Sequence, residues 1–302
     1  MSVLSETAKL ALLRSGHYAR RMSRLTFPGV AVLCYHGVVP GAGERMAFGP
    51  LHVTAAAFEG HCRVIRKLCN PVSFAEWQAA MDGGPPLAPR AVLVTFDDGY
   101  RTILTLAKPI LERYGIPAVA FICSDPVEQR VLLWYDAVAR LRGEDAAEQM
   151  KNAPFAEWRR LVQSAMTKAD DADPQAVLRP DEIRALARVP GFEIGAHTAS
   201  HVMLARATPE EQRNEIVRNK AALEAWTDRP VTLLAYPNGR PGEDYTPESV
   251  DIVRAIGFAA AFSMRTGFAT ASQPRFELPR FLMMRAITAP DLAHRFAYSW
   301  YR

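Results

Sequence analysis

Two short clusters of polar residues in this sequence could do chemistry together. Asp97 and Asp98 directly follow one apolar run, and His197 and His201 follow another. Adjacent acids can simply cap a turn, and isolated histidines are usually structural polar groups. Imidazoles four residues apart can, however, converge on one ion, as they do in other metal sites with this spacing. Because both clusters lie at the ends of strand-like runs, we favour a shared metal site.

Asp98, His197 and His201 form the ligand set that we predict. Two imidazoles and one carboxylate leave a coordination position open, which is typical of catalytic rather than structural zinc. Zn²⁺ is therefore the first candidate, and Co²⁺, Ni²⁺ and Fe²⁺ suit the same ligands. A metal in such a site polarises a carbonyl group and lowers the pKa of bound water to about 7. Asp97, left outside the ligand set, could then accept a proton from that water as a general base.

A third segment of interest, Tyr236-Pro237-Asn238-Gly239, ends another apolar run. A proline and a glycine fix the backbone N–H groups of such a turn, and these groups could stabilise a developing oxyanion. Turns of this composition are also common where they have no function. Tyr236 and Asn238 are therefore candidate substrate-contacting residues because they lie at the end of a strand.

Short apolar runs alternate with helical patterns from residue 29 onwards. This alternation predicts an α/β fold in which helices cover a parallel sheet. Spacing alone does not distinguish a barrel from an open sheet, although a barrel would bring the strand-terminal residues to one mouth. The expected strands are 30–35, 91–96, 118–123, 192–196, 231–236, 258–262 and 281–284.

Two segments fall outside this alternation. Residues 125–185 are charged and rich in helical patterns, and we predict that they form an insertion over one face of the barrel. Residues 1–28 contain a basic, partly amphipathic helix, whereas residues 29–302 are expected to form a single domain. A helix over residues 1–25 could lie on an anionic membrane surface or pack against the rest of the protein.

The composition is that of a globular protein. The 302 residues are 49% hydrophobic with a formal charge of +4, and no basic stripe interleaves with aromatic residues, so no nucleic-acid partner is expected. No apolar run reaches the roughly 20 residues of a membrane span, and none has the form of a signal peptide. The four cysteines form no CxxC motif, which favours free thiols in a reducing compartment. We expect a cytoplasmic protein whose membrane contact, if any, is peripheral and limited to its N-terminal helix.

Two further histidines lie outside these motifs. His52 is expected in a loop, and His61 is expected on the surface of a helix. Neither is expected to take part in the chemistry.

The order of the motifs resembles that of the polysaccharide deacetylase family, the NodB-homology or carbohydrate esterase 4 group. The resemblance rests on residues 95–100 (TFDDGY), residues 197–201 (HTASH), the later proline–glycine loop, and residues 34–38 (CYHGV). It covers roughly residues 30–285 apart from the insertion. The resemblance implies a distorted (β/α)7 TIM-like barrel and hydrolysis of N-acetyl groups on GlcNAc-type sugars.

The resemblance also implies roles for individual residues. Asp97 matches the catalytic base of the family, and Asp98, His197 and His201 match its metal ligands. Asn238 falls where the family has a tyrosine whose backbone N–H helps to form the oxyanion hole. A role for a backbone N–H survives this change of side chain.

Two positions depart from the family pattern. Ala235 replaces the arginine of the third motif, and Arg280 stands where the family has a histidine general acid. We predict that Arg280 substitutes for the missing arginine and orients Asp97 through a bidentate pair. An arginine cannot donate a proton near neutral pH, so the acid must lie elsewhere. His36, at the end of the first strand, is our candidate, and a structural hydrogen-bonding role is its alternative.

The predicted function is hydrolysis of an N-acetyl group from an amino-sugar-containing glycan or glycan precursor, such as a lipid-linked or nucleotide-linked intermediate. A sugar N-deformylase, or a hydrolase of another small acyl group, is a close variant. A catalytically decayed carbohydrate-binding protein and a metal amidohydrolase of another barrel type are the remaining alternatives. Retention of both aspartates and both histidines argues against the decayed binder, which would need no base beside a metal.

Overall fold

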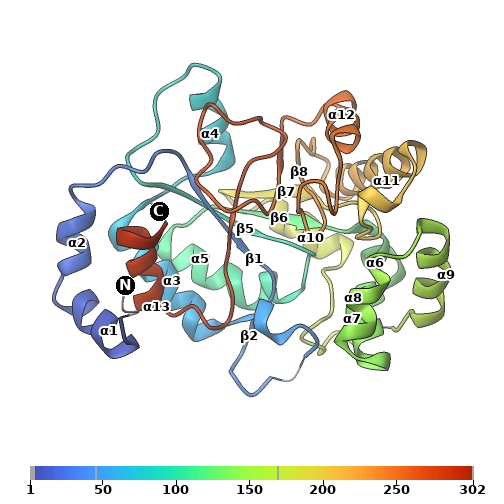
Figure 1. Ribbon diagram of the computed structural model, residues 1–302, viewed down its shortest axis with the longest axis horizontal. Coiled ribbons are helices and arrows are strands. Elements are labelled where there is room, and N and C mark those ends of the chain that lie inside the picture. The colour runs from blue at the N-terminus through green and yellow to red at the C-terminus, as the bar shows by residue number, and fades with distance from the viewer. Residues whose placement is uncertain (1–3, 45, 169, 301–302) are drawn as a thin grey trace.

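A curved sheet of parallel strands forms the centre of the protein (Figure 1). The computed structural model describes residues 4–44, 46–168 and 170–300. The main strands are ordered β10-β1-β5-β6-β7-β8-β9 across the sheet. Their bounds are β1 (Ala31–Tyr35), β5 (Ala91–Phe96), β6 (Ala118–Ile122), β7 (Phe192–Ala196), β8 (Leu233–Ala235), β9 (Ala260–Phe262) and β10 (Phe281–Leu282). Three short strands accompany them: β2 (Val38–Val39), β3 (Val53–Thr54) and β4 (Asn70–Pro71).

The sheet curls into a distorted barrel. Phe262 of β9 forms a parallel bridge with Leu278, just before β10, so the two ends of the strand order meet. The predicted barrel is therefore confirmed, and each predicted strand is present in the expected place. Strands β8, β9 and β10, near this junction, are shorter than their apolar runs.

Alternate residues of each strand point to opposite sides, which gives the protein two apolar clusters. Leu93, Phe121 and Phe262 belong to the cluster inside the barrel. Val94 and Ala120 belong to the larger cluster between the strands and the surrounding helices. Burial on both sides explains why the strands are continuous apolar runs rather than alternating ones.

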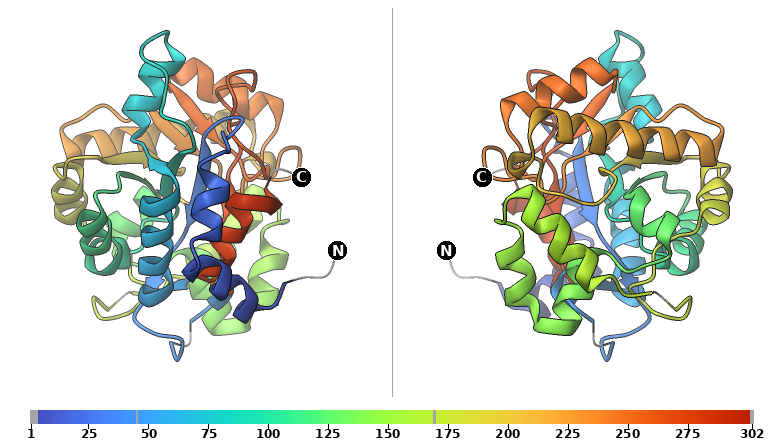
Figure 2. Two further views of the ribbon diagram at one scale, coloured as in Figure 1. Left: turned by 90° about the vertical axis from the view of Figure 1, so that its left-hand side faces the viewer. Right: turned by 90° about the vertical axis from the view of Figure 1, so that its right-hand side faces the viewer.

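Helices surround the barrel (Figures 1 and 2). Several begin at the caps expected from the sequence; Thr208, for example, forms a capping box with Glu211 at the start of α11. The helices are α1 (Glu6–Arg14), α2 (His17–Met22), α3 (Ala55–Leu68), α4 (Phe74–Met81), α5 (Lys108–Tyr114), α6 (Ser124–Gln129), α7 (Trp134–Arg142), α8 (Glu144–Met150), α9 (Phe155–Ala165), α10 (Pro180–Ala187), α11 (Pro209–Thr227), α12 (Pro247–Ile256) and α13 (Ala289–His294).

Helices α6 to α9 follow β6 and form a group at one side of the barrel (Figure 1). They occupy most of the segment expected as an insertion over residues 125–185. Helix α10 lies in the last part of that segment but packs against β7 and α11, in the layer that covers the barrel.

The N-terminal segment forms two short helices rather than one. Gly16 separates α1 from α2 with a left-handed backbone (φ 74°), which a glycine adopts without steric cost. Helix α1 packs on α13 at the side of the barrel where the N-terminal helices lie (Figure 2). Tyr18 and Met22 of α2 are buried. Lys9 pairs with Asp291 at 2.5 Å. The side of α1 and α2 that carries these contacts therefore packs against the rest of the protein. Membrane contact by residues 1–25 stays a prediction.

Membrane-spanning helices and disulfide bonds were not expected from the sequence, and the described part of the chain can be compared with both expectations. None of the helices there is both long and apolar enough to cross a bilayer. The four cysteines are buried free thiols, as their spacing predicts.

The barrel interior is tight beside β7. A Cβ at Gly195 would overlap the ring of Phe121, which also packs on Phe262. We expect Gly195→Ala to lower the free energy of unfolding by about 1–3 kcal/mol, because an overpacked core must shift its side chains or backbone. Urea denaturation measures the change, with Gly41→Ala as a control, since a Cβ there meets no atom within 4 Å. A Gly195→Ala protein as stable as the control would contradict this description of the interior.

Candidate active site

The C-terminal ends of β5 and β7 bring the two polar clusters together. Asp97 and Asp98 follow β5, and His197 follows β7. Both strands are parallel neighbours of β6, so their ends open at the same mouth of the barrel. The structure thus joins residues that are about a hundred positions apart in the sequence.

Asp98, His197 and His201 converge within this mouth. Asp98 Oδ1 lies 3.4 Å from His197 Nε2 and 3.3 Å from His201 Nε2. All three residues are buried, and their possible ligand atoms lie within 4.8 Å of one another. This is the arrangement that the predicted ligand set requires.

Two further observations show that these residues suit a divalent cation. Asp98 Oδ1 is buried and has no hydrogen-bond partner among the described residues. His197 Nδ1 lies 2.7 Å from the carbonyl oxygen of Ala235, which accepts its proton and leaves the Nε2 lone pair facing Asp98. An orphaned carboxylate oxygen beside an oriented imidazole is the donor pattern of a metal site.

Three imidazoles determine the protonation of Asp98. Burial by itself would raise the pKa of this carboxyl, but His36, His197 and His201 outweigh it and hold the pKa well below its usual range. Burial lowers the pKa of His201, which favours the neutral imidazole that binds metals. Burial acts on His197 in the same direction, but the Asp98 carboxylate outweighs it and raises the pKa.

Asp97 is held by Arg280. The guanidinium donates from Nη1 to Asp97 Oδ1 at 2.6 Å and from Nη2 to Oδ2 at 2.8 Å, which is the bidentate pair predicted from the sequence. Arg280 is fully buried, and its Nε donates to the carbonyl oxygen of Ser263 at 3.2 Å. Burial would raise the pKa of Asp97, but Arg280 and then His197 outweigh it, so the pKa is lowered and the carboxylate is ionised.

His36 lies at the edge of the same mouth. Its Nε2 is 3.9 Å from Asp98 Oδ2, and its side chain is 17% exposed, so the ring is accessible from the pocket. Its Nδ1 is buried without a hydrogen-bond partner in the described chain. The Nδ1 hydrogen bond that a structural role of His36 would use is therefore absent among the described residues.

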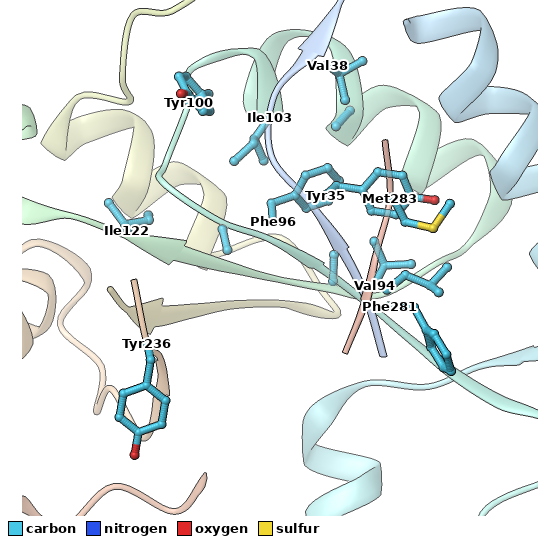
Figure 3. Close-up of a cluster of buried hydrophobic side chains, with 14 of the residues drawn as sticks. Tyr35, Val38, Val94, Phe96, Tyr100, Ile103, Ile122, Tyr236, Phe281 and Met283 are labelled. Carbon is cyan, nitrogen blue, oxygen red and sulfur yellow. The ribbon is translucent and has the colours of Figure 1, made fainter. Parts of the chain in front are cut away.

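The structure separates the two candidates of the proline–glycine loop. Asn238 lines the pocket with a left-handed backbone (φ 54°). Tyr236 does not line it; its ring stacks on Tyr245 at 3.9 Å, and its N–H donates to Phe262. In Figure 3 the Tyr236 ring lies apart from the cluster around Tyr35. The prediction that Tyr236 contacts the substrate is therefore wrong. Ala235 points into the barrel, so the next side chain along the strand must point outward.

Residues from other segments complete a pocket of about 570 Å³ around the site. Tyr135 and Lys151 come from the predicted insertion, and Phe48 comes from the loop after β2. The Phe48 N–H donates to Glu144 at 2.7 Å, and its ring packs edge-on against Tyr135 at 5.7 Å. No sequence pattern predicts this side of the pocket, because a loop and an insertion carry no periodic signal for the site they approach.

His52 lies in the loop before β3 as expected, although it is buried, whereas His61 is buried in α3 rather than on the helix surface, contrary to expectation. The ring of His61 lies 3.2 Å from the hydroxyl of Tyr35 and 2.8 Å from the carbonyl oxygen of Ile287, so it joins strand, helix and loop. His61 lies three residues after Phe58 on the apolar face of α3, and this spacing is a signal that could have placed it.

The left-handed backbone is concentrated at the strand ends of this site. Such conformations cost about 1–3 kcal/mol each for residues other than glycine and persist only where the surroundings impose them. Thr198 is the most constrained, because its side chain branches at Cβ. The residues concerned are Asp98 (φ 76°), Thr198 (φ 60°), His201 (φ 58°) and Asn238 (φ 54°).

Comparison with known proteins places this site in a family. Residues 84–261 match the family described as polysaccharide deacetylase. The chain belongs to the polysaccharide deacetylase family. Among its relatives, YxkH of Bacillus subtilis is 23% identical over 82% of this chain and 69% of its own length. The poly-beta-1,6-N-acetyl-D-glucosamine N-deacetylase of Escherichia coli K12 is 26% identical over 88% of this chain, which spans only 38% of that enzyme.

Solved structures show the same fold. The Streptococcus pyogenes deacetylase PplD, solved in complex with acetate, has a TM-score of 0.65 at 18% identity over 88% of this chain and 97% of its own. IcaB from Ammonifex degensii has a TM-score of 0.63 at 20% identity over 90% of this chain and 98% of its own. In this polysaccharide deacetylase, therefore, the Asp97–Arg280 pair lies at the mouth of a barrel that the family shares.

Removal of Arg280 would leave the Asp97 charge buried without its partner. We expect Arg280→Met to lower the free energy of unfolding by about 3–5 kcal/mol, as for other broken buried ion pairs. The double variant Asp97→Asn with Arg280→Met should recover part of this loss, because no unpaired charge remains. Urea denaturation of the single and double variants tests the expectation. A loss below about 1 kcal/mol in Arg280→Met would contradict it.

Proposed function

We propose that this polysaccharide deacetylase is a metal-dependent hydrolase that removes N-acetyl groups from an amino-sugar-containing glycan. One observation carries the proposal: an ionised carboxylate, Asp97, lies beside a separate carboxylate and two imidazoles that suit a metal. Zn²⁺ is the metal we propose, and Co²⁺, Ni²⁺ and Fe²⁺ suit the same donors. The E. coli relative, named for deacetylation of poly-beta-1,6-N-acetyl-D-glucosamine, supports an N-acetylated sugar as the substrate.

Asp98, His197 and His201 would hold the cation at the barrel mouth. A divalent cation held there would supply Lewis acidity for the acyl carbonyl and for a water molecule. Asp97 accepts the proton from that water as the general base. Arg280 occupies one direction at each Asp97 oxygen, and the Cys34 thiol also donates to Oδ2 at 3.4 Å, so the free lone pair of Oδ1 is the one available to accept the proton.

Two other groups serve the later part of the reaction. The backbone N–H of Asn238, which makes no hydrogen bond within the described residues, donates to the carbonyl oxygen as negative charge develops there. When the C–N bond breaks, the amine leaving group requires a proton, and His36 donates it from the edge of the pocket. The products are an amino sugar and acetate.

Asp97→Asn should lower kcat/KM by a factor of about 10²–10⁴, the usual contribution of a general base, with the content of bound Zn²⁺ unchanged. Acetate release from N-acetylated chitooligosaccharides and from β-1,6-linked N-acetylglucosamine oligomers measures activity. Tyr236→Phe is the control and should match the wild type, because its hydroxyl is outside the pocket and has no hydrogen-bond partner in the described chain.

The same assay separates the alternatives. Release of formate from N-formylated sugars, without release of acetate, would replace the deacetylase with a deformylase. Binding of the oligomers without release of any acyl group would indicate a decayed carbohydrate-binding protein. Equal activity of Asp97→Asn and wild type would exclude Asp97 as the base.

His36→Gln should lower kcat for sugar amides by roughly 10²–10⁴, because the amine can no longer be protonated as it leaves. The loss should be much smaller for an aryl acetate ester, whose phenolate leaves without a proton. Steady-state kinetics on both substrates gives the comparison. An equal loss on amide and ester would assign His36 a structural task instead of proton donation.

A further inference from the structure

The loop that carries the two histidine ligands cannot hold its shape by itself. Residues 197–201 contain two left-handed residues, Thr198 and His201, and belong to no helix or strand. Their backbone groups therefore depend on partners outside the loop. What supplies these partners determines where the two imidazoles lie.

Helix α11 accepts four hydrogen bonds from the loop, three of them from backbone N–H groups. The Asn219 side-chain oxygen accepts the N–H of His197 at 2.9 Å. Glu215 Oε2 accepts both the N–H of Ser200 at 2.9 Å and its hydroxyl at 2.8 Å. The backbone oxygen of Glu215 accepts the N–H of Ala199 at 3.0 Å. Donors of His197, Ala199 and Ser200 thus end on two residues one helical turn apart.

The same loop is held from its other side. The Trp134 indole donates to the carbonyl oxygen of His201 at 3.1 Å, and the backbone N–H of Asp125 donates to Ala199 at 2.8 Å. The Asn219 amide also donates to Ile122 of β6 at 3.0 Å, which ties the loop to the strand beside it. The histidine loop is therefore fixed between α11, β6 and the start of α7.

We propose that Glu215 and Asn219 are positioning residues of the metal site, which set its affinity for the cation without touching it. The inference rests on the proposed metal centre. Asn219 is fully buried and Glu215 is 5% exposed, so water does not replace their hydrogen bonds. Ser200 lies next to His201, and His197 is bonded directly, so loss of either acceptor frees one ligand of the pair to move.

The experiment measures the Zn²⁺ dissociation constant by competition with a chromophoric chelator for the full chain and its variants. Glu215→Ala and Asn219→Ala should each weaken binding by about 10–100-fold, the usual effect of removing a group that orients a ligand. Glu215→Gln should recover most of the affinity, because its amide oxygen can still accept the Ser200 N–H.

The matched control is Gln212→Ala. Gln212 is buried on the same helix, and its amide donates to the carbonyl oxygen of Ala207 rather than to the histidine loop. It should lose stability but bind Zn²⁺ like the wild type. Amide hydrogen exchange of residues 197–201 in metal-free protein gives a second readout, expected to be faster in both alanine variants and unchanged in the control.

The results separate this proposal from the proposed function. Suppose that the wild type binds Zn²⁺ and that Glu215→Ala and Asn219→Ala have the same Zn²⁺ affinity and the same amide exchange as the wild type. This result would overturn the positioning role alone. Equal weakening in Gln212→Ala would also overturn it, since general destabilisation would then explain the effect. A wild-type protein that binds no Zn²⁺ would refute the metal centre, and the positioning role with it.

Discussion

The buried pair of Asp97 and Arg280 is the constraint on which the site depends. Two charges inside a barrel are tolerated only when each neutralises the other with good geometry, and this pair makes two parallel hydrogen bonds. Arg280 comes from the segment that closes the barrel, immediately after Leu278 bridges to β9. Barrel closure and the orientation of Asp97 are thus coupled. Arg280 pairs with Asp97 and not with the neighbouring Asp98, whose carboxylate faces the two imidazoles.

Residues with strained backbone conformations lie at the mouth of the barrel, next to the elements that hold them in place. Asp98 and His201 have left-handed backbones, which strands and helices do not impose, so the neighbouring elements must hold them. Helix α11 and the Trp134 indole do so for the histidine loop. The barrel therefore provides approximate positions through strand order, and hydrogen bonds from the surrounding helices provide the final placement of the side chains.

The sequence predicts much of this because buried parallel strands are continuous apolar runs and their polar ends are conspicuous. Arg280 could be paired with Asp97 because the resemblance to the family implies an arginine where Ala235 stands, and a buried acid requires a cation. The error at Tyr236 was avoidable, since side chains alternate along β8. The wall formed by Phe48 and Lys151 could not be predicted, because the tertiary packing of a loop against an insertion leaves no local pattern.

The most direct test of the account is the anomalous diffraction signal of crystals grown with Zn²⁺. We expect one strong peak about 2.0–2.1 Å from Nε2 of both His197 and His201 and about 2.0–2.2 Å from an Asp98 oxygen. Asp97 should remain paired with Arg280 and outside the coordination sphere. A peak bound by Asp97, or no peak between these three side chains, would contradict the division of work between the two adjacent aspartates.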